Sequence, residues 1–191
     1  MAAVYTLKSE HPNTQTADTD ARPLLEAAEH RLGFVPNMYK GMAIAPGVLD
    51  TYMHGYELFR QHSGFTPAEQ EVVFLTISRC NGCEYCVSAH SMLAENVSSV
   101  PGTTLEAIRE GQPIPDHRLA ALSRFTQVMF ETRGRPGEND VQAFMDAGFS
   151  EEHVMQIILA LAVKTLSNYS NHVTRPTLDD AFSAHAWSGE T

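Results

Sequence analysis

Cysteine is scarce in this chain, and its few copies are crowded into one place. Of the 191 residues only three are cysteines, and they follow one another at intervals of three as Cys80, Cys83 and Cys86. Three clustered cysteines argue against a structural disulfide framework. In a reducing compartment a Cys-x-x-Cys pair instead indicates a redox site or a metal site.

The chain also lacks a surplus of basic residues and a long hydrophobic run. Its 23 Asp and Glu outnumber its 13 Lys and Arg, and the formal net charge of −10 argues against binding to nucleic acid or to anionic membranes. No apolar run approaches the roughly 20 residues that cross a bilayer. The N-terminal segment has no basic stretch followed by an apolar core, as a signal peptide would. We therefore expect a cytoplasmic protein.

Helical periodicity dominates the sequence, and no segment shows the alternation of a strand. Residues 1–19 are polar and lack this periodicity, so we interpret them as an N-terminal polar arm that precedes a single helical domain over residues 20–191. We expect an all-α chain of about eight helices, with Asn37, Thr66, Thr103 and Ser150 as helix N-caps. The last long helix, residues 153–172, is apolar nearly all round, which predicts burial within the domain or between subunits.

The most informative stretch runs from Glu71 to His90. A helix is expected to begin at Thr66-Pro67 and to end at Asn81-Gly82, because glycine adopts the left-handed conformation that closes helices. A second helix should then cover residues 84–95, with Cys83 at its N-cap and Cys86 in its first turn.

This placement has chemical consequences for the two thiols. The positive end of the helix dipole favours a thiolate, which is the reactive form of cysteine. His90 follows Cys86 by one helical turn, so its imidazole can take the thiol proton or stabilise the thiolate. Cys83 lies close enough to form a disulfide with Cys86, so the pair can be oxidised and reduced in a cycle.

The motif resembles that of a known family. Glu71, Cys83, Cys86 and His90 reproduce the E-x11-C-x2-C-x3-H pattern of the alkylhydroperoxidase D-like branch of the carboxymuconolactone decarboxylase family. The segment 168–172, Asn-Tyr-Ser-Asn-His, is similar to one in the peroxidase-related proteins of that family. The resemblance implies an orthogonal helical bundle that forms a homo-oligomer. It also implies a thiol peroxidase that reduces hydroperoxides, uses an external dithiol or thiol protein as reductant, and needs no cofactor or metal.

In that family the second cysteine attacks the peroxide and the first resolves the product, which assigns these roles to Cys86 and Cys83. The histidine deprotonates the thiol and the glutamate relays the proton, which assigns His90 and Glu71. Alkylhydroperoxidase D usually has a histidine just before the second cysteine, where this chain has Tyr85. The full proton relay and the lipoyl-linked reductant of that enzyme are therefore not carried over.

The residues leave several alternatives open. Glu71 could instead be a solvent-facing helix carboxylate; if it is buried, we expect its pKa to be raised and suited to proton transfer. With Cys80, the cysteines and His90 form a C-x2-C-x2-C-x3-H pattern whose ligand types would suit zinc in a binding module. The dithiol could also belong to a thiol–disulfide oxidoreductase or redox sensor, and the fold to a decarboxylase-like enzyme. We regard Cys80 as a buried apolar residue, and Asn168 and His172 as secondary candidates for the site.

Overall fold

The computed structural model describes residues 5–189, and over this range the chain is helical and contains no strand. The all-α class predicted from the sequence is therefore confirmed. The helices are α1 (Ala21–Leu32), α2 (Asn37–Met42), α3 (Pro46–His62), α4 (Pro67–Cys80), α5 (Glu84–Asn96), α6 (Gly102–Glu110), α7 (His117–Glu131), α8 (Glu138–Asp146), α9 (Glu151–Thr174) and the 3-10 helix η1 (Asp180–His185).

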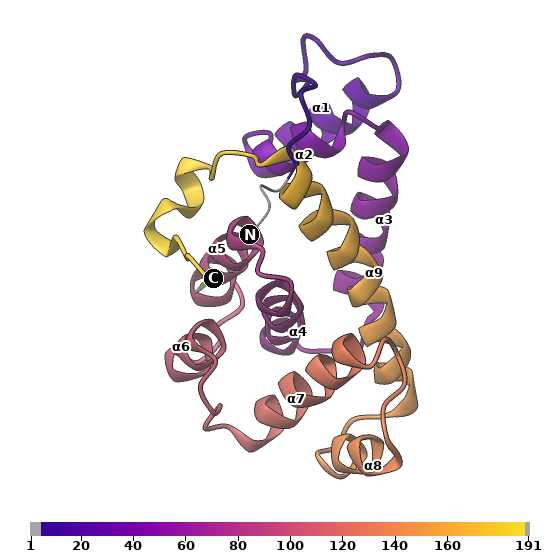
Figure 1. The fold of residues 1–191 in the computed structure, drawn as a ribbon, viewed down its shortest axis with the longest axis vertical. Helices are drawn as coiled ribbons and strands as arrows, with labels where there is room; N and C mark the ends of the chain where they lie inside the picture. Colours follow the sequence, from indigo (N-terminus) through magenta and orange to yellow (C-terminus); the bar gives the residue numbers. More distant parts are fainter. Residues whose placement is uncertain (1–4, 190–191) are drawn as a thin grey trace.

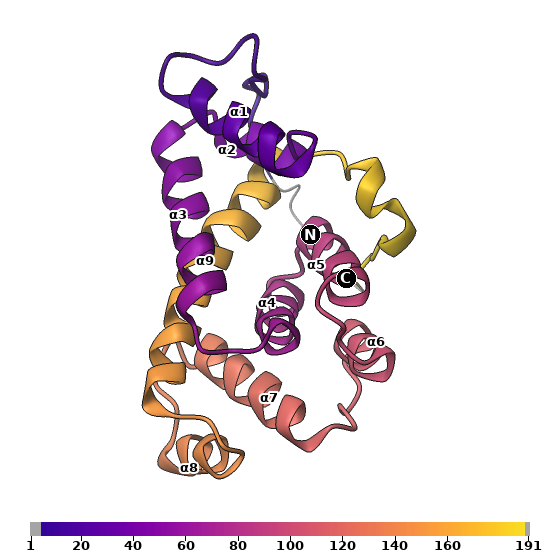
Figure 2. The same ribbon diagram turned by 180° about the vertical axis from the view of Figure 1, so that it is seen from behind.

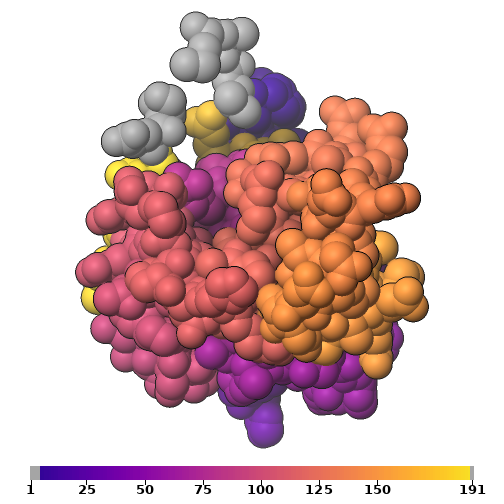
Figure 3. Space-filling model, turned by 90° about the horizontal axis from the view of Figure 1, so that it is seen from below, coloured from indigo at the N-terminus to yellow at the C-terminus, as the bar shows by residue number. Residues whose placement is uncertain are grey.

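Helix α4 forms the centre of the bundle, and the other helices are arranged around it (Figure 1). It packs against α5, α6, α7 and α9, and it carries an unbroken run of buried residues from Glu69 to Ser78. The long α9 lies along α3 and also packs on α2 (Figure 2). The C-terminal η1 lies on α5, while α6, α7 and α8 form much of the end of the molecule away from α1 and α2 (Figure 3). The cysteine motif thus lies at the junction of α4, α5 and α9.

Two of the predicted N-caps are confirmed and two are wrong. Thr66 forms a capping box with Glu69, and Ser150 precedes α9. Asn37 is instead the first residue of α2, and its backbone N–H donates to the Asp179 carboxylate at 3.2 Å. The cap of α2 therefore comes from a residue far along the chain, which local sequence cannot reveal. Helix α6 begins before Thr103, directly after Pro101, whose fixed φ suits a helix start.

Within the chain, helix α9 is buried on one face only, so the domain by itself accounts for part of the predicted burial. Met155 and Tyr169 are 63% and 55% exposed. The opposite face is buried, and much of it is polar. Burial of the exposed face in a subunit interface stays a prediction.

The N-terminal arm lies along its own chain where it is described. The backbone N–H of Leu7 donates to the carbonyl of Val173 near the end of α9, at 2.8 Å. The first four residues of the predicted arm, and the last two residues of the predicted domain, lie outside the described range. Within that range, no helix combines the length and the apolar character that crossing a membrane requires.

Candidate active site

The dithiol lies where α4 ends and α5 begins. Gly82 adopts a left-handed φ of +63° and turns the chain, which leaves Cys83 at the N-cap of α5 and Cys86 in its first turn. This is the predicted placement. Both thiols are free and buried, and the side-chain amide of Asn171 on α9 donates to Cys83 Sγ at 3.5 Å and to Cys86 Sγ at 3.3 Å.

The surroundings of the two cysteines shift their pKa values in opposite directions. Burial alone would raise the pKa of Cys86, but hydrogen bonding from Cys83 and the positive charge of Lys164 hold that pKa well below its ordinary value. The hydrogen bond to Cys86, together with burial, raises the pKa of Cys83. Of the two, Cys86 is therefore favoured as the thiolate, and Cys83 as the thiol that donates to it.

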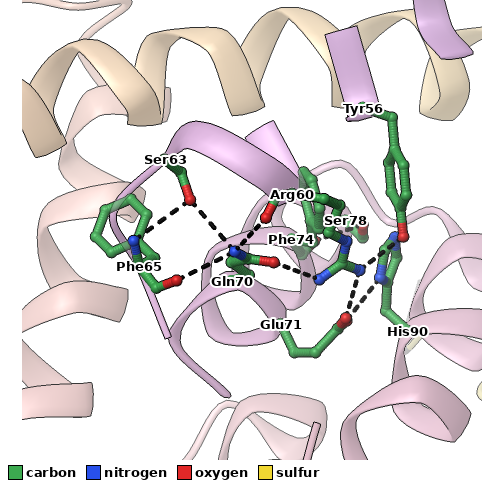
Figure 4. A network of polar contacts seen from close by, with 9 residues as sticks. All are labelled: Tyr56, Arg60, Ser63, Phe65, Gln70, Glu71, Phe74, Ser78 and His90. Carbon is green, nitrogen blue, oxygen red and sulfur yellow. Dashed lines mark hydrogen bonds and ion pairs between the residues drawn. The ribbon is translucent and has the colours of Figure 1, made fainter. Parts of the chain in front are cut away.

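A network of polar contacts holds the His90 ring in place through its Nδ1 (Figure 4). The Nδ1 of His90 lies 2.8 Å from Glu71 Oε2, and the other carboxylate oxygen of Glu71 accepts from Arg60. Because an ionised carboxylate only accepts hydrogen bonds, His90 must carry its proton on Nδ1, and its Nε2 is the free acceptor in the neutral ring. Arg60 also donates to the hydroxyl of Tyr56 at 2.6 Å and to Gln70 at 3.1 Å. The imidazole is thus held in one orientation and one tautomer.

The electrostatics of this network correct one expectation about Glu71. Its side chain is buried, as the catalytic interpretation required, and it does contact His90. Burial would raise the pKa of Glu71, but His90 and Arg60 together lower it. The predicted raised pKa is wrong because His90 and Arg60 both contact the carboxylate, and the contact with Arg60 was not foreseen. Burial and the charge of Lys164 also lower the pKa of His90, which favours the neutral form of the ring.

A cavity of about 440 Å³ opens next to these residues. Its walls are largely apolar and aromatic, and they come from α1, α2, α3, α5 and η1. Of the cysteines only Cys86 lines it, together with His90 one turn further along α5. The lining residues are Arg31, Leu32, Phe34, Pro36, Met38, Tyr39, Tyr52, Tyr56, Tyr85, Cys86, Ala89, His90, Met92, Leu93 and Phe182. A compound in this cavity would therefore meet the Cys86 sulfur and not that of Cys83.

Tyr85 secures the wall of this cavity. Its hydroxyl donates to the Asp179 carboxylate, which also accepts the backbone N–H of Asn37 at the start of α2. The ring packs edge-on against Phe182 in η1, with centroids 5.9 Å apart. Tyr85 thus ties the C-terminal segment to α5 and α2, where the related motif usually has a histidine.

Except for Asn168, which was a secondary candidate, sequence reasoning missed a buried polar stripe on α9. Four polar residues at spacings of three, one and three share the face of α9 that meets the dithiol, and all are at most 5% exposed: Lys164, Ser167, Asn168 and Asn171. Ser167 Oγ lies 3.9 Å from Cys86 Sγ, and Asn171 contacts both thiols. Polar residues at helical spacing within an apolar helix were the available signal. Arg60 was also missed, and nothing in its surroundings in the sequence distinguishes it.

Of the other cysteine and the two secondary candidates, only Asn168 belongs to the polar stripe of α9. Cys80 is half-buried at the end of α4, and burial and the negative charge of Glu131 raise its pKa to about 11. Asn168 accepts from Asn81 at 2.9 Å, whereas His172 stacks on the exposed Tyr169. Over residues 5–189, no group of three or more His, Cys, Asp or Glu side chains is placed to hold a metal ion.

Comparisons with known proteins agree with the motif. Residues 46–123 match the sequence model of the carboxymuconolactone decarboxylase family, and this region contains all four residues of the motif. The resemblance inferred from the motif is therefore confirmed. A comparison with curated proteins finds no match.

Several solved structures share the fold across nearly the whole chain. An alkylhydroperoxidase AhpD core, an uncharacterized peroxidase-related protein from Ralstonia eutropha JMP134, superposes with a TM-score of 0.78 at 23% identity, covering 92% of this chain and 93% of the other. A peroxidase-related protein from Silicibacter sp. TM1040 gives 0.76 at 19% identity, covering 94% of each chain. The debrominase Bmp8, in complex with 2,3,4-tribromopyrrole, gives 0.71 at 16% identity, covering 97% and 96%. The predicted alkylhydroperoxidase D-like bundle is confirmed.

Proposed function

We propose that this chain, which carries the carboxymuconolactone decarboxylase family region in an alkylhydroperoxidase D-like fold, is a thiol peroxidase that reduces organic hydroperoxides. One observation carries the proposal. Cys86, whose pKa is lowered by a hydrogen bond from Cys83 and by Lys164, lies at the wall of an apolar cavity together with His90, whose pKa is also lowered.

In the proposed reaction the Cys86 thiolate attacks the outer oxygen of the hydroperoxide. The O–O bond breaks, Cys86 becomes a sulfenic acid, and an alkoxide leaves and takes up a proton to become an alcohol. The neutral ring of His90 relays this proton from solvent to the alkoxide through Nε2, while Glu71 anchors Nδ1. Cys83 then condenses with the sulfenic acid, which releases water and forms a disulfide. An external dithiol or thiol protein reduces that disulfide.

The cavity supports a bulky substrate with an apolar body. Its volume of about 440 Å³ is far larger than hydrogen peroxide needs, and it falls in the range of small-molecule sites. Arg31 is the one Lys or Arg in its lining, so little positive charge is offered to a dicarboxylate such as a decarboxylase of this family would bind. We therefore favour an organic hydroperoxide as the substrate.

The proposal can be tested by counting thiols before and after one equivalent of tert-butyl hydroperoxide. Wild type should lose two thiols, and Cys83→Ser should accumulate a sulfenic acid on Cys86 that a dimedone-type probe traps. Cys86→Ser should not react. Cys80→Ser is the matched control, because it removes a cysteine outside the cluster and should still lose two thiols.

If wild type keeps its thiols with peroxide while a small disulfide oxidises the pair, the peroxidase proposal fails. The protein would then be a thiol–disulfide oxidoreductase or a redox sensor. Both assignments need the same dithiol, so only the oxidant distinguishes them.

The aromatic lining of the cavity favours reductive dehalogenation as a second candidate. Flat rings can stack on its phenylalanine and tyrosine side chains, and one protein of this fold is a debrominase with a brominated pyrrole bound. The reaction would convert an aryl bromide and two thiols into the arene, a disulfide and hydrogen bromide. Bromide release from 2,3,4-tribromopyrrole by the reduced protein, lost in Cys86→Ser, would support this candidate.

We further propose that the protein is a cytoplasmic homo-oligomer. The exposed apolar residues Met155, Ile158 and Tyr169 on α9 support an interface on that face. A reducing cytoplasm would supply the thiols that return the disulfide to the dithiol. Sedimentation of wild type and of Met155→Glu would test the interface, since a buried charge there should dissociate the oligomer.

A further inference from the structure

Lys164 is the most unusual group in the interior of this protein. Its side chain is fully buried in the middle of α9, and its Nζ has no hydrogen-bond partner among the described residues. The nearest aromatic face is that of Phe74, whose centroid lies 5.5 Å from Nζ. Removing an ammonium from water without a partner is expensive, so a buried lysine that keeps its charge requires a nearby anion.

The surroundings of Lys164 identify this anion. On α9, Ser167 lies one turn after Lys164 on the same face and contacts Cys86 Sγ, and Asn171 one turn later contacts both sulfurs. On α4, Phe74 packs against the ring of His90 with centroids 5.0 Å apart. Lys164 is thus in the layer where α9 meets the dithiol and His90.

The charges around the dithiol balance only if Cys86 is ionised. Glu71 is already paired with Arg60 and hydrogen-bonded to His90. The other titratable groups that face the dithiol from α2, α3 and α5 have pKa values displaced toward their neutral forms: Tyr39, Tyr52, Tyr56, Cys83, Tyr85 and His90. Asp179 is half-buried behind the Tyr85 hydroxyl, and Arg31 lies at the exposed rim. The Cys86 thiolate is the remaining anion for Lys164.

We propose that Lys164 is the resident counter-ion of the Cys86 thiolate, a positioning residue that stabilises the reduced dithiol and so makes the Cys83–Cys86 disulfide a stronger oxidant. Formation of the disulfide removes the thiolate and leaves the Lys164 ammonium buried without an anion. Reduction restores the pair. Other disulfide proteins are strong oxidants for the same reason, because their reduced form is stabilised.

If Cys86 is a thiolate in the reduced protein, reduction of the disulfide must release one proton. A dithiol reductant supplies two electrons and two protons. The protein keeps one proton on Cys83, while Cys86 stays a thiolate and the second proton is released. With dithiothreitol, whose thiols remain protonated between pH 6 and 8, the equilibrium constant for reduction of the protein should therefore rise about tenfold per pH unit. If both cysteines took up protons, this constant would not depend on pH.

The experiment measures this equilibrium constant in dithiothreitol redox buffers from pH 6 to 8, by quantifying free thiols after acid quenching. Wild type should show the tenfold rise per pH unit. Lys164→Met should show a shallower rise with pH and be at least about tenfold harder to reduce at pH 7.5, because loss of an opposite charge moves a thiol pKa by about one to three units. Lys8→Met, which removes the same charge from an exposed position, should match wild type.

A flat pH profile in wild type would overturn the proposal, and so would an unchanged slope in Lys164→Met. The wild-type measurement stands even if that variant fails to fold, and Lys164→Gln, of similar length and without the charge, then takes its place with the same expected result. Peroxide is absent from this experiment. The reaction with peroxide therefore tests the proposed peroxidase activity separately, and either proposal can fail without deciding the other.

Discussion

Arg60 is expected to stabilise the fold mainly by neutralising Glu71. Glu71 is 1% exposed, and in Arg60→Met its carboxylate would keep the bond to His90 but lose its cationic partner. Breaking a buried ion pair from one side costs about 3–5 kcal/mol. Since the Arg60 side chain is 21% exposed, we expect the lower end, about 3 kcal/mol. Losing the stacking of Arg60 over the Tyr56 and Phe74 rings adds about 1 kcal/mol.

A double-mutant cycle separates these two contributions. Urea unfolding at pH 7 would compare wild type, Arg60→Met, Glu71→Gln and the double variant. Because the double variant leaves no charge unpaired at this position, it should recover about 2–3 kcal/mol relative to the sum of the single variants. Arg124→Met, at an exposed position, should change the free energy of unfolding by no more than about 0.5 kcal/mol.

The effect of Arg60→Met should also depend on pH. The folded-state pKa of Glu71 lies below its unfolded value, so Glu71 stabilises the protein above the unfolded value and loses this contribution as pH falls through the folded value. Without Arg60 the folded pKa rises, and the deficit of the variant should shrink below about pH 4. Additivity within about 0.5 kcal/mol in the cycle, or a deficit that does not change with pH, would refute the pairing of Arg60 with Glu71 as the source of stability.

Three further changes test the cavity, the other cysteine and the C-terminal segment. Ala89→Trp should fill the cavity beside Cys86 and reduce kcat/KM for cumene hydroperoxide at least about tenfold more than for hydrogen peroxide, since one misplaced contact can cost that much; equal losses would mean that the cavity does not bind substrate. Alkylation of Cys80 by iodoacetamide should accelerate only above about pH 10, because its pKa is about 11, and fast labelling at pH 7 would contradict its assigned environment. Tyr85→Phe removes the hydroxyl that donates to Asp179 and should cost about 1.5–3 kcal/mol in urea unfolding, with faster amide exchange in residues 180–185; unchanged exchange would show that this bond does not hold the segment.

Local sequence predicted the parts of the site that depend on neighbouring residues. The capping box at Thr66, the turn at Gly82, and the positions of Cys83 and Cys86 at the start of α5 all follow from short-range chemistry. The spacing of Cys86 and His90 placed them together at one wall of the cavity for the same reason.

The long-range parts of the site could not be predicted in this way. Arg60 reaches Glu71 from the preceding helix, and Asp179 caps α2 from 142 residues away. These contacts depend on how helices cross, which periodicity does not encode. Lys164 is a different case, since an isolated lysine in an apolar helix was visible in the sequence, but only the packing of α9 on α4 and α5 shows that it is buried next to the dithiol.

The arrangement of the dithiol has a consequence for synthesis of the protein. The two cysteines leave the ribosome long before Asn171, which follows Cys86 by 85 residues. At common translation rates this interval lasts roughly 4–17 s. During that time neither Lys164 nor Asn171 is present to stabilise a thiolate, so the nascent thiols have ordinary acidity and react slowly. The chain therefore acquires its most reactive group only when α9 docks, which protects the unfinished protein from oxidation.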